Sequence, residues 1–354
     1  MPITKKSGSS WSGYAGLLLG ILLIIYLFSK VDLAGAIGRI SAIGFASGFI
    51  LLPYFLLHLF ETIAWMRLFP GVTTAISFFK LLKIQFISET VSMTLPAGVA
   101  VGEPLRSYLC RRFIGIPIPA GVASVAVRRL VLASAQGLYT IIGAIVGFSF
   151  LESVSVKMIG FGGLGYILAG AGTLIFLLFF VFLVLLLNGK AAQKLHTFLM
   201  LVPFKKVKQW LLEKESGFLD TDAELRGFKG SFIARLLPVV LLYVLAWFML
   251  ALESFIILKL LGVQISFFQV IAIDTVLTIL RGLFFFIPSG LGVQELGYMA
   301  FFQALGMADF QSNGVAFMLL RRFKEAIWYA IGYAIMFLSG VHLSDAEQVT
   351  KNES

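Results

Sequence analysis

The chain has 354 residues, of which 59% are hydrophobic and 13% charged, and its formal net charge is +10. Its mean hydropathy is +0.96. These values exclude an ordinary soluble domain and a disordered chain. Apolar runs of helical length instead predict an all-α polytopic membrane protein. A transmembrane barrel would show short segments of alternating hydrophobicity, which this sequence lacks.

The positive charge does not point to nucleic acid. In a membrane protein, an excess of Lys and Arg usually reflects cytoplasmic loops and anionic lipid head groups, so we expect no nucleic-acid partner. The single cysteine, Cys110, excludes an intrachain disulfide and a cysteine-based metal cluster, and the three histidines are scattered. We therefore expect no metal site and no cofactor.

The first apolar run, Tyr14–Phe28, follows a polar start that contains Lys5 and Lys6. It has features of a signal peptide, but an uncleaved first span is favoured because more spans follow. The later apolar segments predict helices over Ala42–Phe69, Ser77–Leu95, Val99–Arg112, Ile118–Phe150, Ile159–Leu187, Ser231–Leu261, Phe267–Ile287, Leu291–Leu305 and Gly314–Gly340.

A polar, basic stretch interrupts these segments between Asn188 and Gly230. The positive-inside bias predicts that it is a cytoplasmic loop. We expect residues 1–354 to form a single membrane domain, with repeat one at about 42–150, the basic loop at 188–230 and repeat two at about 231–340. The predicted location is a bacterial-type plasma or inner membrane, with both termini in the cytoplasm.

The two proposed repeats share sequence landmarks in the same order. PAGVAVGE, from Pro96 to Glu103, matches PSGLGVQE, and Pro288 lies 192 residues after Pro96. The remaining matched pairs are Glu61 with Glu253, Arg67 with Lys259, SFFK at Ser77 with SFFQ at Ser266, and Arg128-Arg129 with Arg321-Arg322. Because apolar similarity alone would not keep Pro, Gly, Glu and paired Arg in this order, we infer an internal duplication.

The topology of the repeats follows from the side of the membrane on which each loop lies. If Lys5, Lys6 and the basic loop are all cytoplasmic, Ser77–Arg112 must enter and leave the membrane on the cytoplasmic side, either as a re-entrant hairpin or as a pair of full crossings. Ser231–Leu261 then runs opposite to Ala42–Phe69. This predicts an inverted-repeat helical bundle with two re-entrant, broken-helix hairpins near the bilayer midplane. The alternative, in which Ser77–Leu95 crosses once, puts Lys5/Lys6 and the basic loop on opposite sides.

The hairpin breaks contain glycine and proline, which free backbone N–H groups that need partners inside a membrane. The predicted break residues are Pro96, Gly98, Gly102, Pro288, Gly290 and Gly292.

Charged residues inside apolar helices are costly and mark candidate sites. The paired arginines would bind an anion, since a planar guanidinium matches phosphate; the structural alternative is pairing with Glu103 or Glu89. The predicted head-group site comprises Glu103, Arg106, Arg128, Arg129, Glu295, Arg321 and Arg322. Glu61 and Glu253 are candidate proton carriers. For Glu103 and Glu295, stabilisation by a helix N-terminus is a sufficient structural reason. We identify no catalytic residues.

The stretches PAGVAVGEPLR (96–106) and PSGLGVQE (288–295), with the arginine-bearing helices that follow, carry a family resemblance. The sequence resembles the transmembrane, flippase-like region of the lysylphosphatidylglycerol synthase family over about residues 10–340. Val101-Gly102 replaces the family's usual double glycine before Glu103. The soluble aminoacyl-transferase domain of bifunctional members has no counterpart after Gly340. The resemblance implies lipid handling without synthase chemistry, so we expect that the protein is not an enzyme.

The function predicted from these features is binding of an anionic, phosphate-bearing lipid and its translocation between leaflets. Two alternatives are an accessory protein of a membrane-lipid biosynthesis system, which would contact lipid-synthesis enzymes, and an integral-membrane enzyme acting on a lipid-linked substrate. The sequence does not identify the lipid, the direction of transport, the coupling ion or the oligomeric state.

Overall fold

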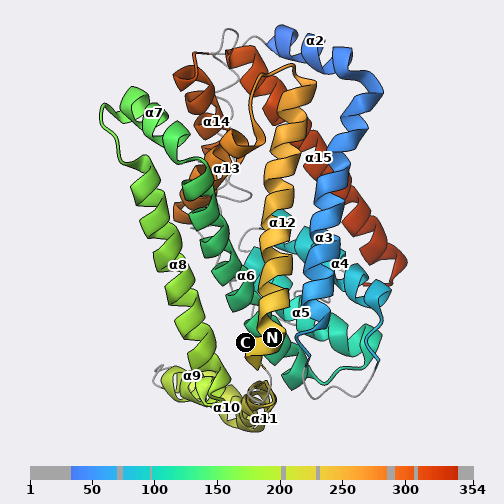
Figure 1. Cartoon of the computed structure of the whole chain (residues 1–354). Coiled ribbons are helices and arrows are strands. Elements are labelled where there is room, and N and C mark those ends of the chain that lie inside the picture. The colour runs from blue at the N-terminus through green and yellow to red at the C-terminus, as the bar shows by residue number, and fades with distance from the viewer. Residues whose placement is uncertain are drawn as a thin grey trace.

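The protein is helical throughout the part of the chain described by the computed structural model (Figure 1). The described residues are 33–69, 75–95, 98–200, 205–228, 232–284, 292–306 and 310–341. The helices of the first half are α2 (Leu33–Ile43), the 3-10 helix η1 (Gly44–Ile50), α3 (Leu51–Met66), α4 (Phe78–Thr94), α5 (Gly98–Ile114), α6 (Ile118–Val146), α7 (Phe148–Ile159) and α8 (Leu164–Leu187). Those that follow are α9 (Ala191–Leu199), α10 (Lys205–Glu213), α11 (Glu215–Arg226), α12 (Phe232–Leu260), α13 (Phe267–Leu283), α14 (Val293–Ala304) and α15 (Phe310–Leu338).

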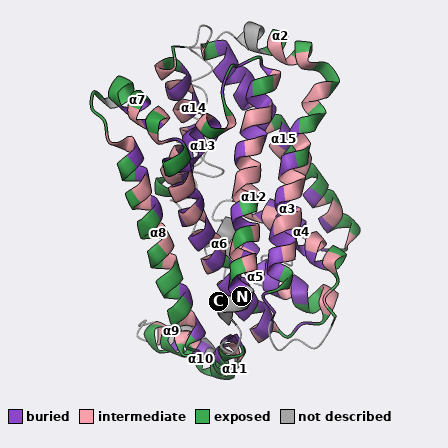
Figure 2. Ribbon diagram, viewed as in Figure 1, coloured by how far each residue is buried: buried purple, intermediate pink, exposed green. Residues whose placement is uncertain are grey.

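Four helical segments within the described residues are long and apolar enough to cross a membrane: Ile37–Met66, Ile118–Val146, Leu164–Leu187 and Leu236–Leu260. The span in α8 is the most apolar of them and is mostly exposed in the isolated chain (Figure 2). An apolar helix with exposed Leu and Phe side chains is suited to contact with lipid. The chain is therefore a membrane protein built from helices.

The long helix α12 joins two hydrophobic cores. Near its start, Tyr243 packs in a core formed by α3 to α6, which includes Trp65 and Val131. Near its end, Ile257 packs in a second core formed with α13, α14 and α15, which includes Phe302. The first core consists mainly of residues from the first half and the second mainly of residues from the second half, and α12 contributes to both.

The halves are also interlocked by helix contacts between them. α3 packs along α12, while α4 packs against α15 and α13 packs against α6. In Figure 1, α4 and α5 occupy the lower half of the bundle and α13 and α14 the upper half. The equivalent helices have matching lengths: α4 and α13 have 17 residues each, and α6 and α15 have 29 each.

Glycine permits the closest approach between helices α6 and α8. A Cβ atom added at Gly137 of α6 would lie 2.5 Å from the backbone nitrogen of Phe176 in α8. Small residues at such crossings let two membrane helices pack backbone against backbone. This contact holds the exposed, apolar α8 on the rest of the bundle.

Several predicted segments differ from the structure; for example, the helix expected over Ile159–Leu187 begins at Leu164, and the one expected over Ala42–Phe69 contains the 3-10 helix η1. The helix predicted over Ile118–Phe150 ends at Val146, and α7 starts separately at Phe148. The break falls at Gly147, where an added Cβ would lie 2.3 Å from the Cβ of Ala272 in α13. Crowding by α13 thus favours glycine, the poorest helix former after proline, at this position.

The predicted basic loop contains three short helices, α9 to α11, gathered at the lower end of α8 (Figure 1). Asp222 of α11 accepts hydrogen bonds of 2.9 Å from the backbone N–H groups of Ala192 and Gln193, at the start of α9. Arg226 donates to the carbonyl of Gly189 at 2.9 Å. These contacts fix α9 and α11 to the turn that follows α8.

Candidate functional site

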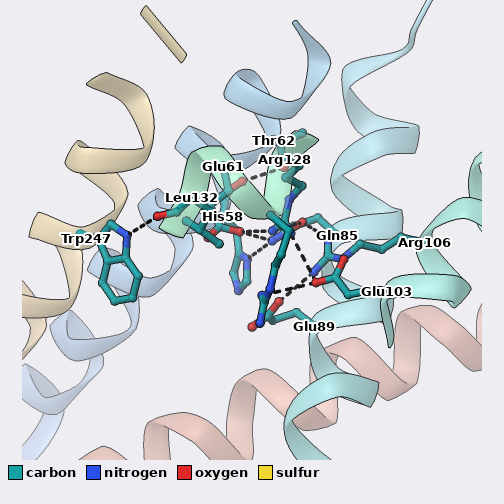
Figure 3. Close-up of polar contacts among 11 residues, drawn as sticks. His58, Glu61, Thr62, Gln85, Glu89, Glu103, Arg106, Arg128, Leu132 and Trp247 are labelled. Atoms are coloured by element: carbon teal, nitrogen blue, oxygen red, sulfur yellow. Dashed lines mark hydrogen bonds and ion pairs between the residues drawn. The ribbon is translucent and has the colours of Figure 1, made fainter. Parts of the chain in front are cut away.

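A buried group of charged side chains lies where α3, α4, α5 and α6 meet (Figure 3). We call it site one and define it as Glu61, Gln85, Glu89, Glu103, Arg106 and Arg128. Helices α3 and α6 of this group are candidate membrane spans. Charge at this depth requires ion pairs, hydrogen bonds or a bound ligand, because isolated charges are costly there.

Gln85 of α4 is the centre of site one (Figure 3). Its amide nitrogen donates a hydrogen bond to Glu61, and its amide oxygen accepts one from Arg106. Arg128 Nη2 in turn contacts Glu61 Oε2 at 2.8 Å. A neutral amide with both a donor and an acceptor thereby links an acid on α3 to a base on α5.

Glu103 joins three arginines at one side of the site. Its carboxylate oxygens lie 3.3 Å from Arg106 Nε, 3.7 Å from Arg128 Nη1 and 3.4 Å from Arg129 Nη1. Arg106 also donates to Glu89 Oε2 at 2.8 Å. The side chain of Arg129 is 50% exposed, whereas that of Arg128 is 1% exposed. Arg129 therefore lies at the rim of the site and Arg128 inside it.

The indole of Trp65 lies near both buried arginines. The guanidinium carbons of Arg106 and Arg128 lie 5.6 and 5.8 Å from its ring centroid. Trp65 is itself oriented by a 2.7 Å hydrogen bond from Nε1 to Ser124 Oγ on α6. An aromatic face adds a modest attraction for guanidinium groups. The indole thus stabilises the two buried guanidinium groups and leaves their N–H donors available for hydrogen bonds.

Several polar atoms of site one lack a hydrogen-bond partner within the described chain. They are Arg128 Nε and Nη1, Arg106 Nε and Glu103 Oε2. Two of these nitrogens are near Glu103, but their geometry does not make a hydrogen bond. Buried guanidinium donors without acceptors are unfavourable, so this side of the arginines is suited to an added acceptor such as a phosphate oxygen or water.

The second half has a corresponding group of charges on α12, α13 and α15. We call it site two and define it as Glu253, Asp274, Arg321, Arg322, Lys324 and Glu325. Glu253 is fully buried; its oxygens lie 2.9 Å from Lys324 Nζ and 3.9 Å from Arg321 Nε. Arg322 pairs with Glu325 at 2.5 Å on the same helix. The matched residues Glu61 and Glu253 thus both face a base on the following arginine-bearing helix.

Site two differs from site one at the position of Gln85. Counted from the SFFK and SFFQ starts of α4 and α13, Gln85 corresponds to Asp274. Asp274 is buried and accepts a 2.9 Å hydrogen bond from the hydroxyl of Tyr139 on α6. At the position that matches Arg106, the chain has Tyr298, whose hydroxyl donates to Ser254. The two sites share an acid–arginine pair but have different polar surroundings.

Most of the predicted head-group residues lie in these two groups, Arg129 at the rim of site one. The candidate proton carriers Glu61 and Glu253 are both ion-paired. Gly98 begins α5, Gly102 lies against Ser88 and Ser92 of α4, and Gly292 has a positive φ of 83° just before α14. Pro96, Pro288 and Gly290 lie outside the described residues, as does the side chain of Glu295.

Sequence reasoning did not select Gln85, Trp65 or Asp274. The SFFK–SFFQ match pairs Gln85 with Asp274, two polar residues in otherwise apolar surroundings, and could have drawn attention to both. The role of Trp65 depends on contacts of its side chain with α5 and α6, so no local pattern predicts it.

Comparison with protein families shows a match to the lysylphosphatidylglycerol synthase TM region over residues 14–332. Neither the curated proteins nor the solved structures contain a significant match. The matched segment covers most of the 354 residues and includes every residue of both sites. The chain therefore belongs to the lysylphosphatidylglycerol synthase transmembrane-region family.

Proposed function

We propose that this protein binds an anionic, phosphate-bearing lipid by its head group and moves it between the two leaflets. The observation that carries the proposal is the pair of buried acid–arginine sites, one in each half, at matched positions of apolar helices. Family membership supports a link to lipid metabolism. The spare guanidinium donors of Arg106 and Arg128 support an anionic ligand.

The path would run between two inverted repeats. The position of α4 and α5 at the same end of the bundle as the basic α9–α11 segment, with α13 and α14 toward the other end, supports this architecture (Figure 1). In such repeats, discontinuous helices supply sites near the midplane, and one repeat moves against the other. Site one would then open toward the cytoplasm and site two toward the outside, while the acyl tails stay in the bilayer.

When no lipid is bound, the acidic residues of each site would neutralise its basic residues. Glu61, Glu89 and Glu103 neutralise the arginines of site one. Glu253 and Glu325 do so in site two. A phosphate would compete for the same guanidinium groups through charge-assisted, forked hydrogen bonds. Exchange between carboxylate and phosphate avoids leaving an uncompensated charge in the membrane.

The test is lipid transfer by the full chain reconstituted in vesicles. Arg129→Ala and Arg322→Ala should each slow transfer of a labelled anionic phospholipid by about tenfold or more, equivalent to about 1.4 kcal/mol of lost interaction. Arg129→Lys should also impair transfer, because lysine keeps the charge but loses the fork. Arg67→Ala, at the exposed end of α3, is the matched control and should transfer at the parent rate.

Parent rates for both Arg129→Ala and Arg322→Ala, in variants that express and fold normally, would contradict the proposal. The groups would then be interhelical ion pairs only. A covalent change in the lipid, detected by mass spectrometry after incubation with the purified protein, would instead favour an enzyme.

A further inference from the structure

The helices between the two repeats have an outer surface that the rest of the chain does not cover. Leu195 and Phe198 of α9 are 52% and 66% exposed, and Lys190 and Lys194 beside them are exposed as well. We define these four residues as the α9 face. From this face we propose that α9 lies in the head-group layer of the membrane and binds anionic phospholipids, separately from the two buried sites.

The helical spacing puts apolar and basic groups on one side of α9. Lys194, Leu195 and Phe198 lie within about one third of the helix circumference, since successive residues turn by about 100°. His196 points the other way: it is buried, and its Nε2 lies 3.0 Å from the carbonyl of Leu211 in α10. One side of α9 therefore packs on its neighbours, and the other presents leucine, phenylalanine and lysine outward.

The α9 face is held in a fixed position near the end of a membrane span. Helix α8 ends at Leu187, and α9 starts at Ala191 after a turn at Gly189, where φ is 67°. Asp222 and Arg226 of α11 bind this turn and the first N–H groups of α9. Because α8 is a candidate span, its end and the α9 face both fall at the level of the bilayer surface.

Charge favours an anionic lipid surface over a protein as the occupant of this face. Residues 188–214 contain six lysines and one acid, Glu213. Of these lysines, Lys190, Lys194, Lys208 and Lys214 are seen to be exposed. Helices with apolar residues on one face flanked by lysine lie in the membrane interface, where the apolar groups enter the bilayer and the ammonium groups meet anionic head groups.

The experiment places a fluorescent reporter on the α9 face of the full chain. The single natural cysteine, Cys110, is buried, so an introduced cysteine can be labelled selectively. Phe198→Cys would carry an environment-sensitive dye, and Gln193→Cys, exposed on another side of the same helix, is the matched control. Both are reconstituted in vesicles of zwitterionic lipid with or without anionic phospholipid, and lipids with a spin label below the head group serve as quenchers.

In anionic vesicles, the dye at Phe198→Cys should emit at shorter wavelength and be quenched about threefold or more above the dye at Gln193→Cys. Adding Lys190→Gln and Lys194→Gln should reduce that difference. Raising the salt from about 0.1 to about 1 M should reduce it too, since the Debye length falls from about 10 to about 3 Å.

Two results would overturn the proposal. Water-like emission at Phe198→Cys in both kinds of vesicle would place the α9 face in solvent. Protection from an aqueous quencher without any quenching by spin-labelled lipid would indicate a protein partner or a second copy of this chain. Neither result bears on transfer through the arginine sites, which the vesicle assay of Arg129→Ala and Arg322→Ala tests separately.

Discussion

Arg128 and Arg129 are neighbours on α6, yet the helix turns their side chains about 100° apart. Arg128 points into site one, where it contacts Glu61 at 2.8 Å, and Arg129 lies half-exposed beside Glu103. A buried ion pair depends on both partners, because removal of one leaves the other charge uncompensated. An exposed pair contributes little, since water and salt screen it.

Neutralising the two arginines should therefore affect stability unequally. Arg128→Gln should lower the free energy of unfolding by about 3–5 kcal/mol. Arg129→Gln should change it by about 1 kcal/mol or less. Thermal unfolding of the purified protein in detergent measures both effects.

The double variant Glu61→Gln/Arg128→Gln is the control for pairing. It should be more stable than Arg128→Gln alone, because no unpaired acid remains. If the double variant loses the sum of the two single losses, Glu61 and Arg128 do not stabilise one another.

The sequence could predict those site residues that carry a charge, because burying a charge in a membrane protein is costly unless it has a partner. Arg106, Arg128 and Arg321 stand out as charges among apolar residues, and so do Glu61 and Glu253. Gln85 and Trp65 do not, since neither carries a charge and their roles depend on helices brought together by folding. Asp274 is paired with Tyr139, 135 residues away in sequence, which no local pattern could indicate.

At the level of helices, α6 and α8 are joined through glycine. A Cβ at Gly137 would clash with the backbone of α8, whereas a Cβ at Gly170 of α8 meets nothing within 4 Å. Backbone atoms cannot rotate away from a clash as a flexible side chain can. The same substitution by alanine can therefore be compared at a crowded position, Gly137, and at an open one, Gly170.

Gly137→Ala should lower the free energy of unfolding by about 1–3 kcal/mol, the usual cost of overpacking. Gly170→Ala should leave it unchanged or raise it by up to about 1 kcal/mol, because alanine favours the helix. Thermal unfolding in detergent distinguishes them. Equal melting temperatures for the two variants would mean that α8 is not held by this contact.

The long helices were predictable because they are nearly continuous apolar runs, and the observed ends of α12 differ from the predicted ones by one residue each. The helices α9 to α11 were not, because short segments rich in lysine and polar residues resemble a loop in sequence. Their apolar positions have a helical pattern, but Asp222 and Arg226 fix them only through contacts outside each helix.

Across the whole molecule, the arrangement of α3 against α12, α4 against α15 and α13 against α6 relates the two halves. If the repeats are inverted, the segments before α4 and α13 lie on opposite sides of the membrane. Ala75 and Gln264 are exposed residues at matched places, each two residues before the SFF sequence.

Ala75→Cys and Gln264→Cys should therefore react with a membrane-impermeant thiol reagent from opposite sides of sealed vesicles or intact cells. The parent chain, whose single cysteine is buried, is the control and should remain unlabelled. Labelling of both variants from the same side would exclude the inverted repeat while leaving the arginine sites in place.

The distribution of charges within each half also bears on how the protein is made. Every acid and base of site one lies between Glu61 and Arg129, and every one of site two between Glu253 and Glu325. The buried charges of the first half can thus neutralise one another before the ribosome has synthesised the second half. During insertion into the membrane, no arginine of one half then has to remain unpaired in the bilayer until an acid of the other half has been inserted.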